Sequence, residues 1–192
     1  MANANITKNA LAQSLKELGS KKNFDKITVA DISDQCGVNR QTFYYHFADK
    51  YELLNWIYNQ EIFTPLTSEL TFENWPEKWM DLFRYMKNNK KFLKNTIGSS
   101  NNYFEQYMEK SLVTLFEKAI DDLDPNIALS DAEKNVYANF FAYGLTGVVV
   151  DWVMKGMKES EEEFVKLLQK VVFNTERLGY EMYLYRSGKN NK

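Results

Sequence analysis

Residues 28–47 read TVADISDQCGVNRQTFYYHF, and this stretch decides the fold. Thr28 and Asp31 have the spacing of a capping box, which predicts that a helix begins here. The apolar face of this helix would carry Val29, Ile32 and Cys36. Gly37 lies where a left-handed residue ends a helix, and Asn39 is suited to cap the next one. Two short helices joined by a glycine-bearing turn are the helix-turn-helix pattern.

The second helix of this pattern has two distinct faces. At about 100° per residue, a helical wheel places four side chains on one arc: Arg40, Gln41, Tyr44 and Tyr45. Phe43 and Phe47 fall on another side, where they would anchor the helix to a core. Arginine can form two hydrogen bonds to guanine and glutamine two to adenine, while tyrosine hydroxyls reach phosphates or base edges. The wheel therefore predicts a DNA-reading face, with a purely structural helical hairpin as the alternative.

The remainder of the chain predicts further helices and no sheet. Three prolines and eight glycines are few for 192 residues, which favours long helices. Three more capping-box spacings predict helix starts: Asp49 with Glu52, Ser130 with Glu133, and Ser160 with Glu163. We expect helices over residues 49–63, 130–157 and 160–186. The last carries an apolar stripe of Phe164, Leu168, Val171, Thr175, Leu178, Met182 and Tyr185. The predicted fold class is all-α.

The uncharged run from Asn135 to Val150 is shorter than a membrane span. It has 16 residues, two of which are Asn139 and Thr146, whereas a transmembrane helix needs about 20 predominantly apolar residues. We therefore expect a buried helix here. The first residues lack the apolar segment of a signal peptide, and the single cysteine, Cys36, excludes an internal disulfide. These features predict a cytoplasmic protein.

The composition argues against an enzyme. The chain has one histidine and one cysteine, no glycine-rich phosphate loop and no Gly-x-Ser-x-Gly element. We expect no catalytic residues, no cofactor and no metal. The net charge of −2 does not itself indicate nucleic acid, although residues 1–50 carry seven Lys and Arg against five Asp and Glu. The prediction of DNA binding therefore depends on the motif.

Residues 40–54, RQTFYYHFADKYELL, closely resemble the signature of TetR-family regulators, and residues 27–39 match the elements that precede it. Within that family the chain is most similar to regulators of dihydroxyacetone kinase, through residues 24–28 and 49–57. The resemblance implies a three-helix DNA-binding head at 1–50 and a larger helical body at 51–192 that binds an effector and dimerises. It also implies a homodimer on a palindromic operator, switched by a small-molecule effector.

The resemblance assigns roles to single residues of the head. Bases would be read by Arg40, Gln41, Thr42 and Tyr44, and phosphates would be held by Thr28, Tyr45, His46 and Lys50. The helical wheel independently supports Arg40, Gln41, Tyr44 and Tyr45. It puts Thr42 and His46 on the opposite shoulder, so these two depend on the resemblance. A packing or capping role for His46 stays open. Lys50 follows the cap Asp49 at the start of the next helix, where its ammonium could instead reach the backbone.

The aromatic residues of the body have two interpretations. In the family such residues line an effector pocket, which implies a candidate set of Trp79, Phe83, Tyr103, Tyr107, Tyr143 and Trp152. Aromatic residues at helical spacing also commonly form a core. Gly144 and Gly147 would permit close helix approach, so the last two helices of each subunit are expected to form a four-helix dimer interface. The alternative is that the apolar stripes of both helices belong to the internal core. A body that senses a protein partner stays open, as does the choice between repression and activation.

Overall fold

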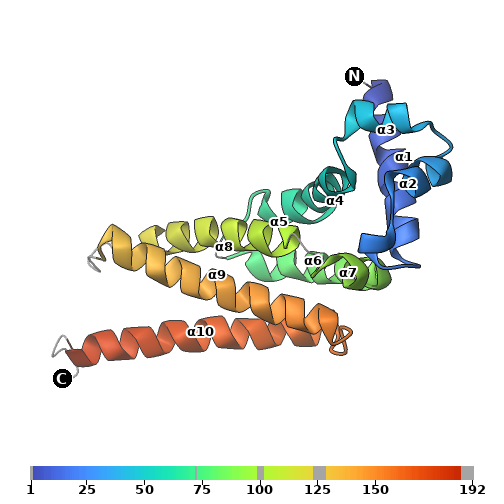
Figure 1. Cartoon of the computed structure of the whole chain (residues 1–192). Coiled ribbons are helices and arrows are strands. Elements are labelled where there is room, and N and C mark those ends of the chain that lie inside the picture. Colours follow the sequence, from blue (N-terminus) through green and yellow to red (C-terminus); the bar gives the residue numbers. More distant parts are fainter. Residues whose placement is uncertain (1, 72, 99–101, 123–128, 187–192) are drawn as a thin grey trace.

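The computed structural model describes residues 2–71, 73–98, 102–122 and 129–186, and the side chains of 2–4, 122 and 175–186 lie outside this description. Within these ranges the chain forms helices and contains no strand. Figure 1 shows a group of short helices near the N-terminus, from which long helices extend toward the C-terminus at the opposite end. The predicted all-α fold is confirmed.

The N-terminal head consists of α1 (Ala2–Gly19), a 3₁₀ turn η1 (Phe24–Lys26), α2 (Val29–Cys36) and α3 (Arg40–His46). α1 packs against both α2 and α3. The core between them is formed by side chains that are at most 3% exposed: Leu11, Leu15, Phe24, Ile27, Ile32, Phe43 and Phe47. Each such side chain contributes roughly 1.5–3 kcal/mol on burial, and together they fix how the helices of the motif lie.

The segment after the head is one continuous helical path with an irregular turn. α4 (Lys50–Tyr58) passes into a π-helical turn, η2 (Asn59–Phe63), and then into α5 (Thr64–Thr67). The predicted start is confirmed, because the Asp49 carboxylate accepts two backbone hydrogen bonds from the first turn of α4. The π turn was not predicted. The apolar side chains along this path are at most 1% exposed: Leu53, Leu54, Ile57, Ile62 and Phe63.

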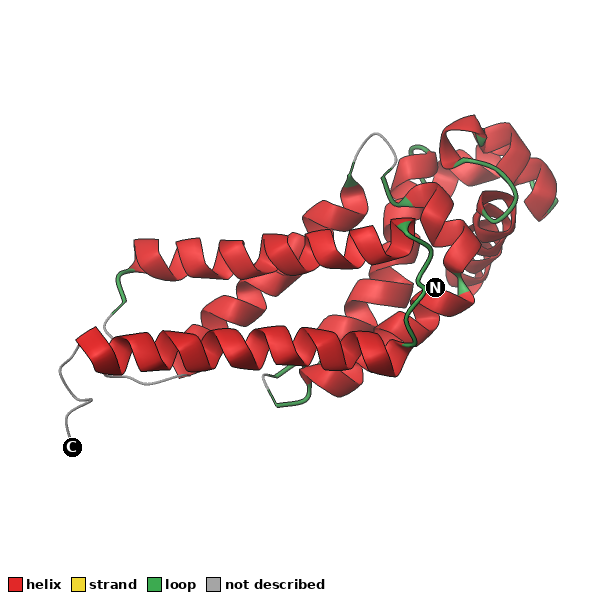
Figure 2. Ribbon diagram, turned by 90° about the horizontal axis from the view of Figure 1, so that it is seen from below, coloured by secondary structure: helices red, strands yellow, loops and turns green. Residues whose placement is uncertain are grey.

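The body contains α6 (Trp75–Asn88), α7 (Lys90–Thr96), α8 (Tyr103–Asp122), α9 (Asp131–Met154) and α10 (Glu161–Arg186). The capping boxes predicted at the starts of α9 and α10 are confirmed by reciprocal hydrogen bonds between each serine and the glutamate three residues later. α8 packs along α9, and α10 lies against α6. Figure 2 shows α9 and α10 running antiparallel in front of the other helices, and Figure 1 shows that they diverge from the loop that joins them.

α9 is apolar on nearly all sides. Among the described residues, α9 is the helix that is long and apolar enough to cross a membrane. In its most apolar 18-residue segment, 39% is buried inside the protein. The prediction of a buried helix holds for one face only, which carries Ala138, Ala142, Leu145, Val149 and Val153. The opposite face is 47–71% exposed at Val136, Tyr137, Phe140, Tyr143 and Val148. We call this the open face of α9.

Candidate nucleic-acid interface

α2, the turn and α3 have the geometry of the predicted motif. The Thr28 hydroxyl accepts from the Asp31 N–H at 3.1 Å, and the Asp31 carboxylate accepts from the Thr28 N–H at 2.9 Å. Gly37 has a φ of 73°, a left-handed conformation that glycine adopts without strain. The Asn39 side-chain oxygen accepts from the Thr42 N–H at 2.7 Å and caps α3. The predicted caps and the predicted turn are confirmed.

α3 presents to solvent the four residues that the helical wheel selected. Arg40 and Gln41 are exposed, and the side chains of Tyr44 and Tyr45 are 56% and 82% exposed. On the other side, Phe43 and Phe47 lie in the head core at 0% and 3% exposure. Two adjacent exposed tyrosines beside an arginine form a surface suited to contact with another molecule. We call these four residues the α3 face.

Thr42 and His46 are half-buried on the shoulder of α3, outside the α3 face. The Thr42 hydroxyl donates to the side-chain oxygen of Asn39 at 3.0 Å, so its proton already has a partner. The His46 ring meets the edge of the Tyr45 ring, with 4.9 Å between centroids. Neither residue lies on the exposed side of α3, although His46 contacts Tyr45, and a role for them in DNA contact stays a prediction.

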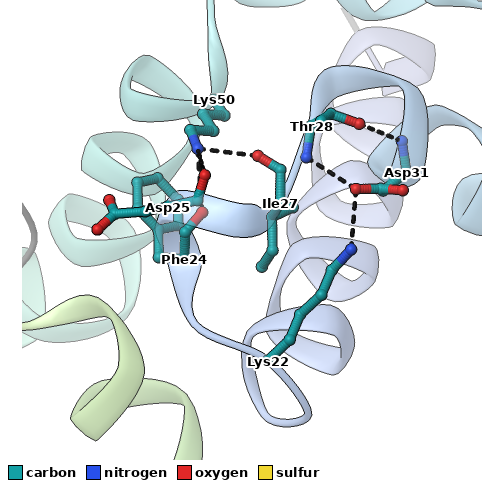
Figure 3. Close-up of polar contacts among 7 residues, drawn as sticks. All are labelled: Lys22, Phe24, Asp25, Ile27, Thr28, Asp31 and Lys50. Carbon is teal, nitrogen blue, oxygen red and sulfur yellow. Dashed lines mark hydrogen bonds and ion pairs between the residues drawn. The ribbon is translucent and has the colours of Figure 1, made fainter.

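Lys50 has its contacts inside the head, and its predicted phosphate contact stays a prediction. Its ammonium donates to the backbone carbonyls of Phe24, Asp25 and Ile27 at 3.0, 3.1 and 2.8 Å, as Figure 3 shows. It also lies 4.7 Å from the centroid of the Phe24 ring. An ammonium carries three protons, and all three have partners here. Lys50 therefore ties the first turn of α4 to η1.

Thr28 and Asp31 belong to a second polar cluster in Figure 3, together with Lys22. The pKa of Asp31 is lowered to about 2, first by the hydrogen bond from the Thr28 backbone and then by the Lys22 ammonium 2.9 Å away. Since the Thr28 hydroxyl accepts from the Asp31 N–H, its own proton is available to an outside acceptor such as a phosphate oxygen. The exposed position of Thr28 is compatible with its predicted role.

Three of the six aromatic residues predicted to line a pocket form one cluster in the body. Trp79, Phe83 and Trp152 are at most 4% exposed. The Phe83 ring centroid lies 5.5 Å from that of Trp79 and 5.2 Å from that of Trp152, and Trp152 stacks on Phe164 of α10 at 4.4 Å. A cavity of about 20 Å³ lies beside Trp79, which is room for about one water. We call these four residues the aromatic cluster.

The other three residues of the predicted pocket lie elsewhere. Tyr103 is half-buried, with its ring 6.3 Å from that of Tyr51. Tyr107 stacks on Phe63 at 4.3 Å and lines an open groove of about 300 Å³ between α8 and the end of α5. Tyr143 is 55% exposed on the open face of α9. The structure therefore does not gather the six residues around one space.

Comparison with known proteins identifies the family of this chain. The model of the bacterial regulatory proteins of the tetR family matches residues 13–57, and a model of the transcriptional regulator C-terminal region matches residues 73–174, more than half of the chain. The chain belongs to the TetR family. It is therefore a DNA-binding transcriptional regulator, and the helix-turn-helix of α2 and α3 is its DNA-binding element.

Individual TetR-like relatives match nearly the whole chain. The HTH-type dhaKLM operon transcriptional activator DhaS of Lactococcus lactis subsp. lactis (strain IL1403) is 25% identical over 167 residues, which are 85% of this chain and 89% of that protein. The solved structure of the dihydroxyacetone kinase operon activator DhaS matches with a TM-score of 0.69 at 24% identity, over 90% of this chain and 97% of that one. The subgroup suggested by the sequence resemblance agrees with these relatives.

Two further solved structures share the fold at lower identity. NalD, the secondary repressor of the MexAB-OprM multidrug efflux pump in Pseudomonas aeruginosa, has a TM-score of 0.67 at 14% identity, over 90% of this chain and 96% of its own. The fatty acid degradation regulator FadR from Bacillus halodurans has a TM-score of 0.61 at 16% identity, over 86% and 93%. Activators and repressors thus share this TetR-type architecture.

Sequence reasoning missed one polar contact set at the junction of head and body in this TetR-family chain. Glu61, in the π turn, accepts hydrogen bonds from Lys16 of α1 and Tyr85 of α6. Its partners lie 45 and 24 residues away in the sequence. No local spacing signals such a contact, since it exists only once three helices have been packed together.

Proposed function

We propose that this regulator is a cytoplasmic homodimer that binds a palindromic operator and is switched by a small-molecule effector. The α3 face carries the proposal. Residues at the start of a recognition helix reach deepest into the major groove, so Arg40 would read a guanine and Gln41 an adenine. Tyr44 would lie along the base edges, and Tyr45 and Thr28 would contact phosphates. Regulation of transcription, rather than catalysis, is the activity assigned to the chain.

The operator and the role of Arg40 can be tested together. Sequencing of random DNA fragments retained by the protein should yield a palindrome with half-sites about 34–36 Å apart, one turn of the duplex. Arg40→Ala should cost about 1–3 kcal/mol on that site and relax the preference at one base pair of each half-site. Arg84→Ala, at an exposed arginine of α6, is the matched control. A uniform loss over all sequences would assign Arg40 to the phosphates instead.

The open face of α9 supports the homodimer. α10 also has exposed apolar side chains, since Leu167, Val171 and Phe173 are 50–56% exposed. A Cβ added to Gly144 or Gly147 would meet nothing within 4 Å, so both glycines leave room for another helix to approach. Two helices from each subunit would make a four-helix interface about a two-fold axis. Thr175, Leu178, Met182 and Tyr185 of the predicted stripe have side chains outside the described residues.

The aromatic cluster supports an effector site in the body. The indole N–H groups of Trp79 and Trp152 are buried and have no hydrogen-bond acceptor among the described residues, and the same holds for the hydroxyl of Thr146. A buried polar group without a partner costs about 1–3 kcal/mol. A ligand with an apolar body and oxygen acceptors would supply the missing partners. Because the cavity is small, such a ligand would have to separate α10 from α6, which breaks the contact between Phe83 and Phe164.

This site can be tested through tryptophan fluorescence. Apolar metabolites that carry carbonyl or ether oxygens are screened for quenching of the dimer. Trp79→Phe keeps an aromatic ring and removes the buried N–H, so it should weaken binding of any compound found. Trp56→Phe, on α4, is the control. A compound whose affinity falls equally in both variants binds outside the aromatic cluster.

α4 would pass the signal to the head. Its buried side chains Leu53, Leu54 and Ile57 belong to the same continuous core as the body, so a shift of the body displaces the helix that leads from the head. A coupling of about 1–3 kcal/mol would change operator affinity by about 5- to 150-fold. Spin labels on the two recognition helices should then report a changed separation when the effector binds. An altered affinity at unchanged separation would exclude this mechanism.

A body that senses a protein partner is the second candidate, and the groove beside Tyr107 favours it. The groove is open, and two lysines two turns apart on α8, Lys110 and Lys118, line it together with Thr67, Leu70, Ser111, Thr114 and Leu115. An extended acidic segment fits this shape and charge. Lys110→Glu combined with Lys118→Glu should then abolish regulation in cells and leave operator binding by the purified protein unchanged. Normal regulation by this variant would remove the candidate.

A further inference from the structure

The π turn η2 places one acidic side chain between the head and the body. In this turn the Thr64 N–H donates to the Asn59 carbonyl, five residues back, instead of four. Single π turns within α-helices are rare and occur frequently at functional positions. The turn is in contact with α4, α5 and α8. Glu61, in its middle, is half-buried and has its partners on two further helices.

Glu61 joins three elements through one oxygen. Its Oε2 accepts from the Lys16 ammonium of α1 at 2.5 Å and from the Tyr85 hydroxyl of α6 at 2.6 Å. The side chains of Lys16 and Glu61 are only 18% and 29% exposed, so water screens this pair less than a surface pair. The Lys16 ammonium also lies 5.7 Å from the centroid of the Tyr85 ring. Burial, and then the bond to Glu61, raise the pKa of Tyr85, which keeps its proton on the donor oxygen.

The last turn of α1 is fastened to the body at a second point. The Asn95 amide of α7 donates to the Gly19 carbonyl at 2.8 Å. Gly19 also lies so close to α7 that an added Cβ would be 2.8 Å from Cδ2 of Phe92. α1 packs on both helices of the DNA-binding motif. The head is thus linked to the body twice, covalently through α4 and by these contacts through α1.

We propose that Glu61 is a positioning residue for operator binding. It fixes the angle between α1 and the body, and since α1 carries α2 and α3, it fixes where the α3 face points. α4 alone would leave the head free to pivot about one helix. Together with the hydrogen bond from Asn95 to Gly19, the contact of Glu61 with α1 and α6 removes that freedom, so the two heads of a dimer keep a constant separation. This inference rests on the proposed binding of a two-fold operator.

The test compares Glu61→Ala and Glu61→Gln in the full-length protein. Glutamine can still accept both hydrogen bonds, whereas alanine accepts neither. Spin labels at Asp34 of α2 and Glu77 of α6, both exposed, measure the head-to-body distance within one chain after Cys36→Ser. Glu61→Ala should broaden the distance distribution and weaken operator binding by about tenfold, within the usual range of coupling between sites. Glu61→Gln should restore a narrow distribution and most of the affinity.

The control variant is Asp81→Ala, which removes an exposed ion pair within α6. Both Glu61→Ala and the control remove a carboxylate with a cationic partner, and only the first disconnects α1. A narrow distribution in Glu61→Ala, equal to that of the control, would overturn the proposal, even if its melting temperature fell. The distance is measured without DNA, so it decides this point even if the protein binds no palindrome, a result that would refute the proposed function separately.

Discussion

Phe140→Ala removes the most exposed large apolar side chain of the open face of α9, which is 71% exposed in the single chain. A phenylalanine side chain offers about 150–250 Å² for burial, so roughly 140 Å² of it is open to a partner. Alanine keeps about 40 Å² of this area, so at about 25 cal/mol per Å² the truncation loses about 2.5 kcal/mol per copy if the side chain is fully covered. In a two-fold dimer both copies of the side chain contribute this loss. With half of the side chain covered, the dimer loses about 2–3 kcal/mol, and its Kd rises roughly 30- to 150-fold at about 1.4 kcal/mol per tenfold.

Sedimentation velocity over a series of protein concentrations measures this change, because the dimer should dissociate at higher concentrations in the variant. Tyr45→Ala is the matched control, since Tyr45 is also an exposed aromatic residue, at 82%, but lies on the α3 face. The control should keep the dimer and lose DNA affinity, whereas Phe140→Ala should lose both, because an operator with two half-sites needs two heads. An unchanged dimer Kd in Phe140→Ala would show that the open face of α9 is not the interface.

Three further predictions concern the head. Lys50→Met leaves the carbonyls of η1 without a charged donor, so the free energy of unfolding from urea titration should fall by about 1.5–3 kcal/mol. The salt dependence of operator binding should not change. A shallower salt dependence would mean that Lys50 does contact a phosphate. Phe43→Ala empties the centre of the head core and should cost about 3–5 kcal/mol in the same titration, while a loss under 1 kcal/mol would contradict the packing of α3. The pKa of Asp31 is lowered from 3.8 to about 2 on folding, so its carboxylate contributes stability above pH 3.8 that is lost as the pH falls through about 2. Asp31→Asn should therefore make the urea midpoint depend less steeply on pH between pH 4 and 2. An equal pH dependence of the midpoint in the variant and the parent protein would refute this.

The DNA-binding motif could be predicted from the sequence because its signals are local. The cap at Thr28, the left-handed Gly37 and the cap at Asn39 each lie within three residues of the group that they serve. The two faces of α3 follow from helical periodicity alone, and burial of Phe43 confirms them. Short-range geometry of this kind is the same in any protein that contains the motif, so the resemblance and the helical wheel agree on Arg40, Gln41, Tyr44 and Tyr45.

The rest depended on contacts between distant parts of the chain. The partners of the Lys50 ammonium lie 23 to 26 residues away, so the sequence indicated that the ammonium could reach the backbone but not which carbonyls it would bind. Tyr143 was assigned to a pocket, yet α9 is apolar all round and its periodicity does not say which face is buried. The π turn around Glu61 changes the register of one helix by a single residue, and composition carries no signal for that.

The anchoring of Lys50 also affects how the protein would move along a chromosome. Of the seven basic side chains in residues 1–50, those of Lys16, Lys22 and Lys50 already have partners inside the protein. Arg40 is assigned to a base, so Lys8, Lys21 and Lys26 remain for phosphates in each head. They limit the slope of log affinity against log salt to about −5 for two heads, at about −0.9 per contact. Random DNA retains a protein through such charge alone. A regulator with few free cations leaves random sequence quickly, so its long dwell times are confined to sites where the bases match the α3 face.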